Sequence, residues 1–170
     1  MIAPVNRPSL RYAALLELLR AAESLWQASR VFFAQWHLSP SQFNVLNLLY
    51  HESQGLSQSD LSRELITHRS NVSGLVDRLE SRGLVARKER ATDRRAWRVV
   101  LTADGRALVT TILPVYHQVA EEVWGEFAPD RAASLIDDLR HLEGRAGWVA
   151  ERYAAPEAAA STTSPQKQPR

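Results

Sequence analysis

Basic and hydrogen-bonding side chains are concentrated in one stretch of the sequence, between His68 and Arg98. This stretch holds nine Arg and Lys residues against four Asp and Glu residues, a local net charge of +5, whereas the whole chain sums to only +2. Arginine and lysine at this density displace the counterions that condense on a phosphate backbone. The predicted chemistry is therefore binding of a nucleic acid. A charged surface hairpin that serves only solubility is the alternative.

Residue patterns that support catalysis or metal binding are missing from the sequence. It contains no G-x-S-x-G motif, no phosphate-cradling glycine loop and no cluster of Asp and Glu, and its seven glycines are scattered. No pair of its five histidines has the i, i+4 spacing of a metal site. The chain has no cysteine, which excludes disulfides and thiolate metal sites. We expect neither an enzyme nor a bound cofactor or metal.

Two short predicted helices position the polar side chains. Ser57 and Asp60 have the S-x-x-D spacing that caps the start of the first helix. The second helix is expected to begin near Thr67 and to end at Gly83, the residue type that most often follows a helix. Its apolar residues recur at the spacing of one buried face and are Val72, Leu75, Val76 and Leu79. The residues left to contact DNA are Thr67, His68, Arg69, Ser70, Asn71, Ser73 and Arg78. Asp77 is expected to form an ion pair on the helix surface.

A basic two-stranded hairpin is predicted after the second helix. Its first strand covers Leu84–Lys88 and its turn is centred on Thr92 and Asp93. Apolar residues alternate along the returning strand at Trp97, Val99 and Leu101. Two helices joined by a tight turn and followed by such a hairpin have the layout of a winged helix-turn-helix. The hairpin residues predicted to contact DNA are Arg87, Lys88, Arg94 and Arg95, with Asp93 beside them in the turn.

Long amphipathic helices are predicted on both sides of this unit. One apolar seam advances in steps of three and four through Leu15, Leu18, Ala22, Leu25, Ser29, Phe32 and Trp36. A second seam near the C-terminus runs through Leu135, Leu139, Leu142, Ala146, Val149 and Tyr153. Seams of this kind need a partner helix, so we expect the two ends of the chain to pack together across two subunits.

Cap and breaker residues mark where these outer helices begin and end. Ser39, Pro40 and Gln42 predict the start of one helix, and Thr102 can cap another after the hairpin. That later helix is expected to kink at Pro114, which lacks an amide donor, and to be ended by a second proline, Pro129, which opens the last helix.

A chain of 170 residues can bury one core with appended helices. The sequence predicts a mainly α fold with a small β wing: a winged helix-turn-helix at 39–103 between helical dimerisation regions at 10–38 and 104–153. Residues 1–9 and 154–170 are expected to be disordered, since they are small, polar and interrupted by proline. No stretch reaches the roughly 18 apolar residues of a membrane span. We therefore expect a soluble, cytoplasmic protein with no membrane partner.

The order of the motifs along the chain is specific enough to indicate a family. The diagnostic motifs are LVDRL at residues 75–79, GLV at 83–85, the pair Asp93 and Arg95, and Leu101-Thr102 followed by Gly105. From roughly Leu10 to Tyr153 the chain resembles the multiple antibiotic resistance regulator (MarR) family of bacterial transcription factors. The resemblance implies an obligate homodimer with interlocked terminal helices and a partner of double-stranded DNA, a pseudo-palindromic operator. It implies that the second helix enters the major groove while the wing reaches the minor groove.

The resemblance also implies roles for single residues. Asp93 would hold the wing by pairing with nearby arginines, and Arg95 would enter the minor groove, where a narrow A·T-rich segment concentrates negative potential. A purely structural Asp93–Arg95 ion pair is the alternative. Family effectors are often small aromatic anions, and the residues that would line their pocket are Phe33, Trp36, His37, Tyr116 and His117. The resulting expectation is a repressor released by a small effector; the alternative is a winged-helix protein–protein adaptor without specific DNA binding.

Overall fold

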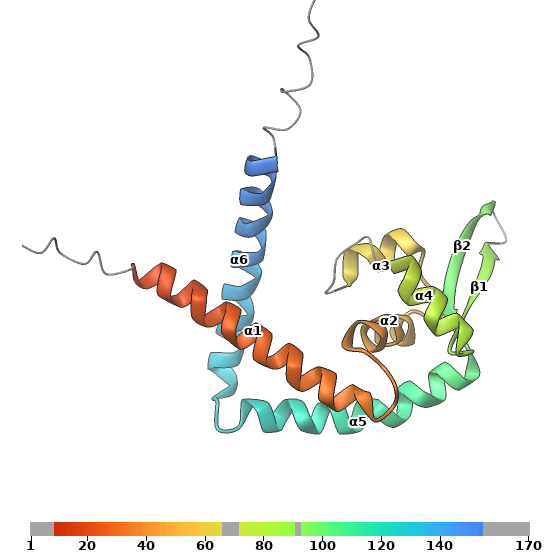
Figure 1. Cartoon of the computed structure of the whole chain (residues 1–170), viewed down its shortest axis with the longest axis horizontal. Coiled ribbons are helices and arrows are strands. Elements are labelled where there is room, and N and C mark those ends of the chain that lie inside the picture. Colours follow the sequence, from red (N-terminus) through yellow and green to blue (C-terminus); the bar gives the residue numbers. More distant parts are fainter. Residues whose placement is uncertain (1–8, 66–71, 91–92, 155–170) are drawn as a thin grey trace, which may run out of the picture. The chain divides into compact units, whose positions relative to one another are not determined.

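The computed structural model describes residues 9–65, 72–90 and 93–154, and for residues 89–90 and 93–96 it describes the backbone alone. Within these ranges the regular elements are helices and one two-stranded antiparallel sheet (Figure 1). The elements are α1 (Leu10–Ala34), α2 (Pro40–His51), α3 (Gln58–Glu64), α4 (Val72–Ser81), β1 (Val85–Arg90), β2 (Asp93–Leu101), α5 (Ala103–Trp124) and α6 (Pro129–Ala154). This confirms the predicted fold class, a mainly α chain with a small β wing.

The chain forms two compact units whose boundary falls between His117 and Gln118, inside α5. The first unit contains α1 to α4, the sheet and the first part of α5. The second contains the rest of α5 and α6. All the described residues of the candidate site belong to the first unit.

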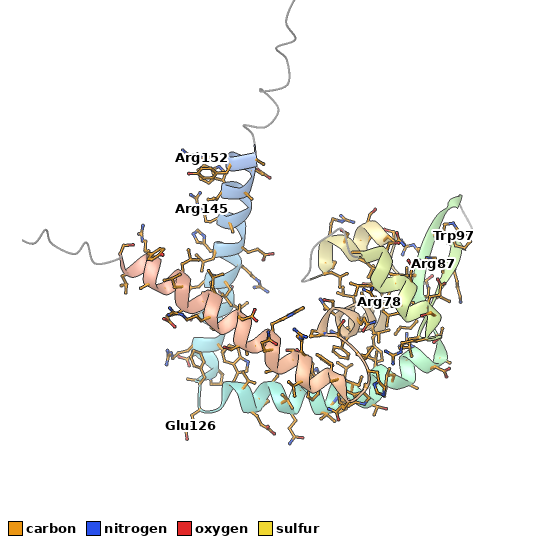
Figure 2. All side chains as sticks on the ribbon, viewed as in Figure 1. Arg78, Arg87, Trp97, Glu126, Arg145 and Arg152 are labelled. Atoms are coloured by element: carbon orange, nitrogen blue, oxygen red, sulfur yellow. The ribbon has the colours of Figure 1, made fainter. Side chains whose placement is uncertain are left out.

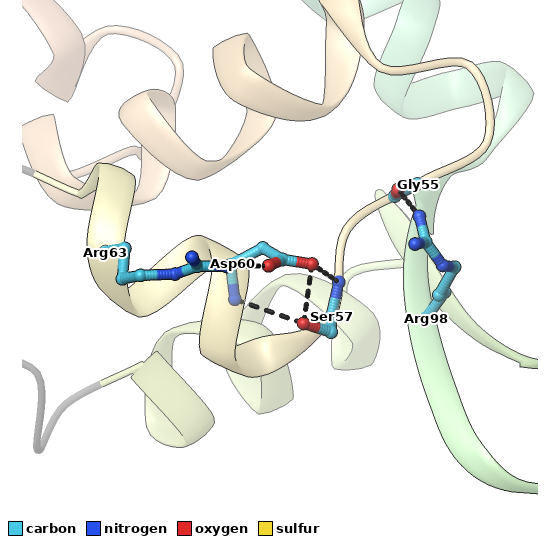
Figure 3. Close-up of polar contacts among 5 residues, drawn as sticks. All are labelled: Gly55, Ser57, Asp60, Arg63 and Arg98. Atoms are coloured by element: carbon cyan, nitrogen blue, oxygen red, sulfur yellow. Dashed lines mark hydrogen bonds and ion pairs between the residues drawn. The ribbon is translucent and has the colours of Figure 1, made fainter.

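Capping boxes start α2 and α3, as the sequence predicts. At α2, Ser39 Oγ accepts from the Gln42 amide at 3.2 Å and the Gln42 side chain accepts from the Ser39 amide at 2.8 Å. At α3, Ser57 Oγ accepts from the Asp60 amide at 3.1 Å, and Asp60 accepts from the Ser57 amide at 3.3 Å (Figure 3). The Ser57 hydroxyl also donates to the Asp60 carboxylate, and this hydrogen bond lowers the pKa of Asp60. Both boxes were predictable because each involves residues within one helical turn.

The C-terminal end of α4 is closed by Gly83, also as predicted. Gly83 has a φ of +69°, the left-handed conformation that glycine adopts at little cost. Its amide donates to the Glu80 carbonyl at 2.8 Å, and the Leu84 amide donates to the Leu79 carbonyl at 3.0 Å. These two bonds form a Schellman motif, which satisfies the last carbonyls of the helix and turns the chain into β1.

Thr102 joins the end of α4, the base of the hairpin and the start of α5. Its Oγ1 accepts from the Gly105 amide at 3.0 Å, which confirms the predicted cap, and donates to the Gly83 carbonyl at 2.6 Å. Its amide donates to the Leu84 carbonyl at 3.2 Å. A Cβ built on Gly105 would lie 2.0 Å from the Leu84 carbonyl oxygen, so only glycine fits this junction.

The core lies between α2, α3, α4, the sheet and the ends of α1 and α5 that face them. All four predicted apolar positions of α4 are buried: Val72, Leu75, Val76 and Leu79. They pack in one cluster with buried side chains of the neighbouring elements, among them Phe33, Leu46, Leu61, Val85, Val99, Val109 and Ile112. Leu56 extends the hairpin by pairing with Val99 of β2. Buried packing along α4 therefore fixes which of its faces is exposed.

Three predicted boundaries were wrong by a few residues. The first strand is Val85–Arg90 rather than Leu84–Lys88, and Asp93 is the first residue of β2 rather than a centre of the turn. The helix that follows Thr102 was predicted to end at Pro129, but it ends at Trp124. Gly125, which has a φ of +53°, stops it first. Pro129 is the first residue of α6, which confirms the prediction that it opens the last helix.

Two further predictions concern the ends and middle of the outer helices. Ser9, assigned to the N-terminal tail from the sequence, caps α1 by accepting from the Tyr12 amide at 3.2 Å. Pro114 lies inside α5, which continues past it to Trp124; a kink there stays a prediction.

Both outer helices expose apolar side chains. α1 exposes large hydrophobic residues along its length, and α6 has no buried residue. On α6 these residues include Ile136, Leu139, Leu142, Trp148, Val149 and Tyr153. Within the described ranges no helix is long and apolar enough to cross a membrane. Those same ranges contain no group of three His, Cys, Asp or Glu residues that could hold a metal ion.

Candidate nucleic-acid interface

The exposed face of α4 carries polar and charged side chains. Ser73, Asp77 and Arg78 are exposed, whereas the opposite face of the helix is buried in the core. The helix lies beside the hairpin, and Figure 2 shows Arg78 on α4 and Arg87 on β1. Two of the predicted contacts, Ser73 and Arg78, are therefore accessible to a ligand.

Several predicted contacts lie outside the part of the chain that the structure describes. Thr67, His68, Arg69, Ser70 and Asn71 precede α4 in the sequence and are outside the described residues. The backbones of the three predicted wing residues Asp93, Arg94 and Arg95 belong to β2, but their side chains are also outside the description. The expectations for these eight residues remain predictions.

Arg87 has a structural role that the sequence does not suggest. Its guanidinium forms ion pairs with Asp77 and Glu80 of α4, and its amide donates to Glu80 at 3.1 Å. The hydrogen bond to Asp77 and the charges of both carboxylates raise the pKa of Arg87. Two carboxylates surround this guanidinium, so it fastens β1 to α4, and its predicted contact with DNA stays a prediction. Asp77 forms the predicted ion pair, and its partner is Arg87 of the hairpin.

Lys88 and Arg98 occupy opposite positions in the hairpin and have different surroundings. Lys88 is exposed, in keeping with its predicted contact to DNA. Arg98 Nη1 donates to the Gly55 carbonyl at 2.5 Å, so this arginine ties β2 to the loop before α3 (Figure 3). A Cβ on Gly55 would lie 2.3 Å from the Val99 carbonyl oxygen. The wing is therefore held against the helices at both its strands.

Aromatic rings gather where the end of α1, the start of α2 and α5 meet. Phe33 stacks on Phe43 with ring centroids 4.3 Å apart and lies 5.0 Å from Tyr116. Phe32 lies 5.2 Å from Trp36 and 5.5 Å from Tyr116. We call these five residues the aromatic cluster. It brings together three of the predicted effector residues, and adds Phe32 and Phe43, which sequence reasoning missed.

The two histidines predicted beside this cluster are both exposed. His37 follows α1 with a φ of +54°, rare for a residue other than glycine. His117 follows Tyr116 on α5. Phe33, in contrast, is only 1% exposed and belongs to the core. Of the predicted effector residues, Trp36 and Tyr116 are the partly exposed aromatic ones.

Arg82, which the sequence analysis did not single out, connects α4 to the turn after α1. Its guanidinium donates from Nη1 to the His37 carbonyl at 2.6 Å and from Nη2 to the Trp36 carbonyl at 3.1 Å. The partners are more than 40 residues apart in sequence, so no local pattern could have indicated the contact.

Comparison with known proteins agrees with this architecture. A model described as MarR family matches residues 37–96, which span α2 to the wing. The HTH-type transcriptional regulator YdgJ of Bacillus subtilis is 30% identical over 128 residues, 71% of this chain and 77% of that protein. This chain belongs to the MarR family. The MarR-family chain is thus a winged-helix transcription regulator, as the sequence resemblance predicts, and its relatives are regulators rather than enzymes.

Two further proteins are similar to the MarR-family chain. It is 29% identical to the transcriptional repressor MprA of Escherichia coli K12 over 101 residues, 59% of this chain and 57% of that one. It is also similar to BpsR of Bordetella bronchiseptica, with 29% identity, a TM-score of 0.65, and coverage of 75% of this chain and 91% of that one. The BpsR structure concerns regulation of DNA binding by 6-hydroxynicotinic acid.

Proposed function

We propose that this regulator is a homodimeric repressor that binds a pseudo-palindromic DNA operator and is released from it by a small aromatic anion. One observation carries the proposal: α4 buries its entire apolar face and exposes Ser73 and Arg78, in the part of the chain that the family model matches. A helix held this way can enter the major groove as a rigid body.

Charge and position assign the individual DNA contacts. Residues at the start of the recognition helix read base edges, a role we give to Arg69 and Asn71 together with Thr67, His68, Ser70 and Ser73. Arg78 and Lys88, both exposed, would contact phosphates. On the wing, Arg95 would enter the minor groove, supported by Arg94 and by Asp93. The repressor role follows that of MprA.

The exposed apolar faces support a homodimer. An isolated helix is marginal in water, and most helical stability in proteins comes from packing of an apolar face. α6 spans 26 residues without a single buried one, so its apolar side chains need a covering surface. A second copy of this chain supplies identical helices, and each Leu buried there contributes about 1.5–3 kcal/mol.

The aromatic cluster and its flanking histidines support the effector. A planar aromatic acid can stack on Trp36 and Tyr116, while His37 and His117 can donate charge-assisted hydrogen bonds to its carboxylate. BpsR responds to such an acid. Phe33 would form the buried wall of this site.

The DNA-binding part of the proposal is tested by a fluorescence-anisotropy titration of the full chain with duplex DNA at two salt concentrations. Each phosphate contact contributes about −0.9 to the slope of log K against log salt, so affinity should fall steeply as salt rises. Binding that ignores salt, or no binding, would favour the alternative, a winged-helix protein–protein adaptor.

The effector part is tested separately with a panel of phenolic and aromatic acids that includes 6-hydroxynicotinic acid. A bound acid should quench tryptophan emission, because Trp36 lies in the cluster, and should displace the duplex. If no acid at millimolar concentration does either, the regulator is a constitutive binder controlled by its abundance.

A further inference from the structure

The turn that follows α1 offers two backbone carbonyls to the rest of the protein. The Leu38 amide donates to the Phe33 carbonyl at 3.2 Å and the His37 amide donates to the Ala34 carbonyl at 2.9 Å. These bonds close α1 as a Schellman motif, with His37 in the left-handed position. The carbonyls of Trp36 and His37 are the ones that Arg82 holds.

A non-glycine residue in the left-handed conformation is strained and persists where its surroundings determine it. The guanidinium of Arg82 is one such determinant, since its planar fork matches two neighbouring carbonyls at once. A change in the conformation of the 36–37 turn therefore changes the acceptors that hold Arg82.

Backbone hydrogen bonds also hold the chain on either side of Arg82 itself. Arg82 lies between Ser81, the last residue of α4, and Gly83, whose carbonyl accepts from Thr102. The backbone on the α4 side is thus fixed by the Schellman motif and by the start of α5. Arg82 is the side chain that joins this rigid end of α4 to the turn carrying Trp36.

We propose that Arg82 is a positioning residue that couples the aromatic cluster to α4. The proposal rests on the proposed function, because it describes how occupation of the cluster reaches the DNA-binding helix. The Trp36 ring packs on Phe32 while the Trp36 carbonyl is bound by Arg82. A ligand that moves the ring moves the turn, and through Arg82 it moves the end of α4. Coupling is reciprocal, so DNA that fixes α4 also stabilises the turn.

Two variants separate the coupling from the binding steps. Arg82→Lys keeps the positive charge but replaces the two-pronged donor by a single point donor, so it cannot hold both carbonyls in the same geometry. His37→Gly keeps both carbonyls and suits the left-handed conformation, and it removes only the imidazole. The first variant should break the coupling, and the second should weaken effector binding with the coupling intact.

The first arm of the test needs no effector. Amide hydrogen exchange is measured on full-length protein with and without a duplex that the wild type enriches from a random library. In the wild type and in His37→Gly, bound duplex should slow exchange of the amides at 35–38 at least threefold. In Arg82→Lys, saturated with the same duplex, this slowing should disappear. Equal slowing in Arg82→Lys and the wild type would overturn the proposal. A wild type that enriches no duplex overturns the proposed function and the coupling together.

The second arm adds 6-hydroxynicotinic acid. The wild type should lose at least tenfold in duplex affinity at saturating acid, whereas Arg82→Lys should lose less than threefold and still bind the acid, by tryptophan quenching, within twofold of wild type. An unchanged tenfold loss in Arg82→Lys would overturn the coupling. A wild type that ignores the acid overturns the effector part of the proposed function alone, and the exchange experiment then decides the coupling.

Discussion

Arg87 and Lys88 are neighbours in β1, yet they have different surroundings. Successive residues of a strand point to opposite sides. Arg87 is bound by Asp77 and Glu80 of α4, and Lys88 is exposed to solvent. The net charge of the stretch therefore overstates the free charge available for DNA, because part of it is paired with carboxylates of the same chain.

Lys88→Ala should weaken binding to every duplex alike and reduce the salt slope by about 1, because one phosphate contact is lost. Anisotropy titrations of the enriched duplex and of a shuffled one, each at several salt concentrations, measure both effects. A selective loss on the enriched duplex would assign Lys88 to base recognition instead.

Asn71→Ala should cost about 1–3 kcal/mol on the enriched duplex and relax the sequence preference, because asparagine pairs with adenine through two hydrogen bonds. Shuffled DNA should bind this variant as it binds the wild type. Equal losses of affinity for both duplexes would show that Asn71 does not read base edges.

Arg87→Ala should destabilise the fold by about 1 kcal/mol, since its ion pairs are partly exposed and screened by solvent. Urea unfolding of Arg87→Ala, Asp77→Asn and the double variant forms a mutant cycle. The effect of Asp77→Asn should shrink once Arg87 is gone. Strictly additive effects would show that this ion pair contributes nothing measurable.

At the scale of elements, α4, the hairpin and α5 form one junction at Gly83, Thr102 and Gly105. The threonine hydroxyl bonds to both glycines, and Gly105 lies against the Leu84 carbonyl. The orientation of the wing relative to α4 is therefore set by short contacts at its base as well as by Arg87.

Gly105→Ala should destabilise the protein by about 1–3 kcal/mol, because its Cβ would overlap the Leu84 carbonyl oxygen, which already accepts from the Thr102 amide. Ala107→Ser, an exposed change one half-turn further along α5, serves as the control and should stay within about 0.5 kcal/mol. Thermal unfolding compares the two. A Gly105→Ala protein as stable as its control would contradict this description of the junction.

Local rules explain which parts of these elements were predictable. The caps at Ser39, Ser57 and Thr102, and the stop at Gly83, depend on residues within a turn or two, so the sequence predicted them. The sequence analysis predicts that α5 ends at Pro129. Glycine also ends helices, and Gly125 comes earlier in the chain, so it stops α5 first. The contacts of Arg82 and Arg87 join segments distant in sequence, and no spacing pattern encodes them.

At the scale of the whole molecule, apolar seams on α1 and α6 distinguish the outer helices from the winged unit. The winged unit has its own buried core, whereas α6 has none of its residues buried. Periodicity predicted the seams, and their exposure in a single chain is the physical reason to expect a second copy.

Leu142→Asp should shift the protein from dimer to monomer, because it places a charge in the apolar face of α6. Arg140→Ala, two residues away on an exposed position of the same helix, should stay dimeric. Light scattering at micromolar concentration distinguishes the two. The monomer should also lose tight binding to a duplex with half-sites about 10 bp apart. A dimeric Leu142→Asp would place the interface elsewhere.

The most direct test of the central claim compares the enriched duplex with a shuffled duplex of the same composition by anisotropy, with the full-length wild type at two salt concentrations. A sequence-specific regulator should bind the enriched duplex at least about 10³-fold more tightly and should lose affinity for both as salt rises. Equal affinities for the two duplexes, or affinities that do not change with salt, would contradict the claim that this winged helix recognises DNA.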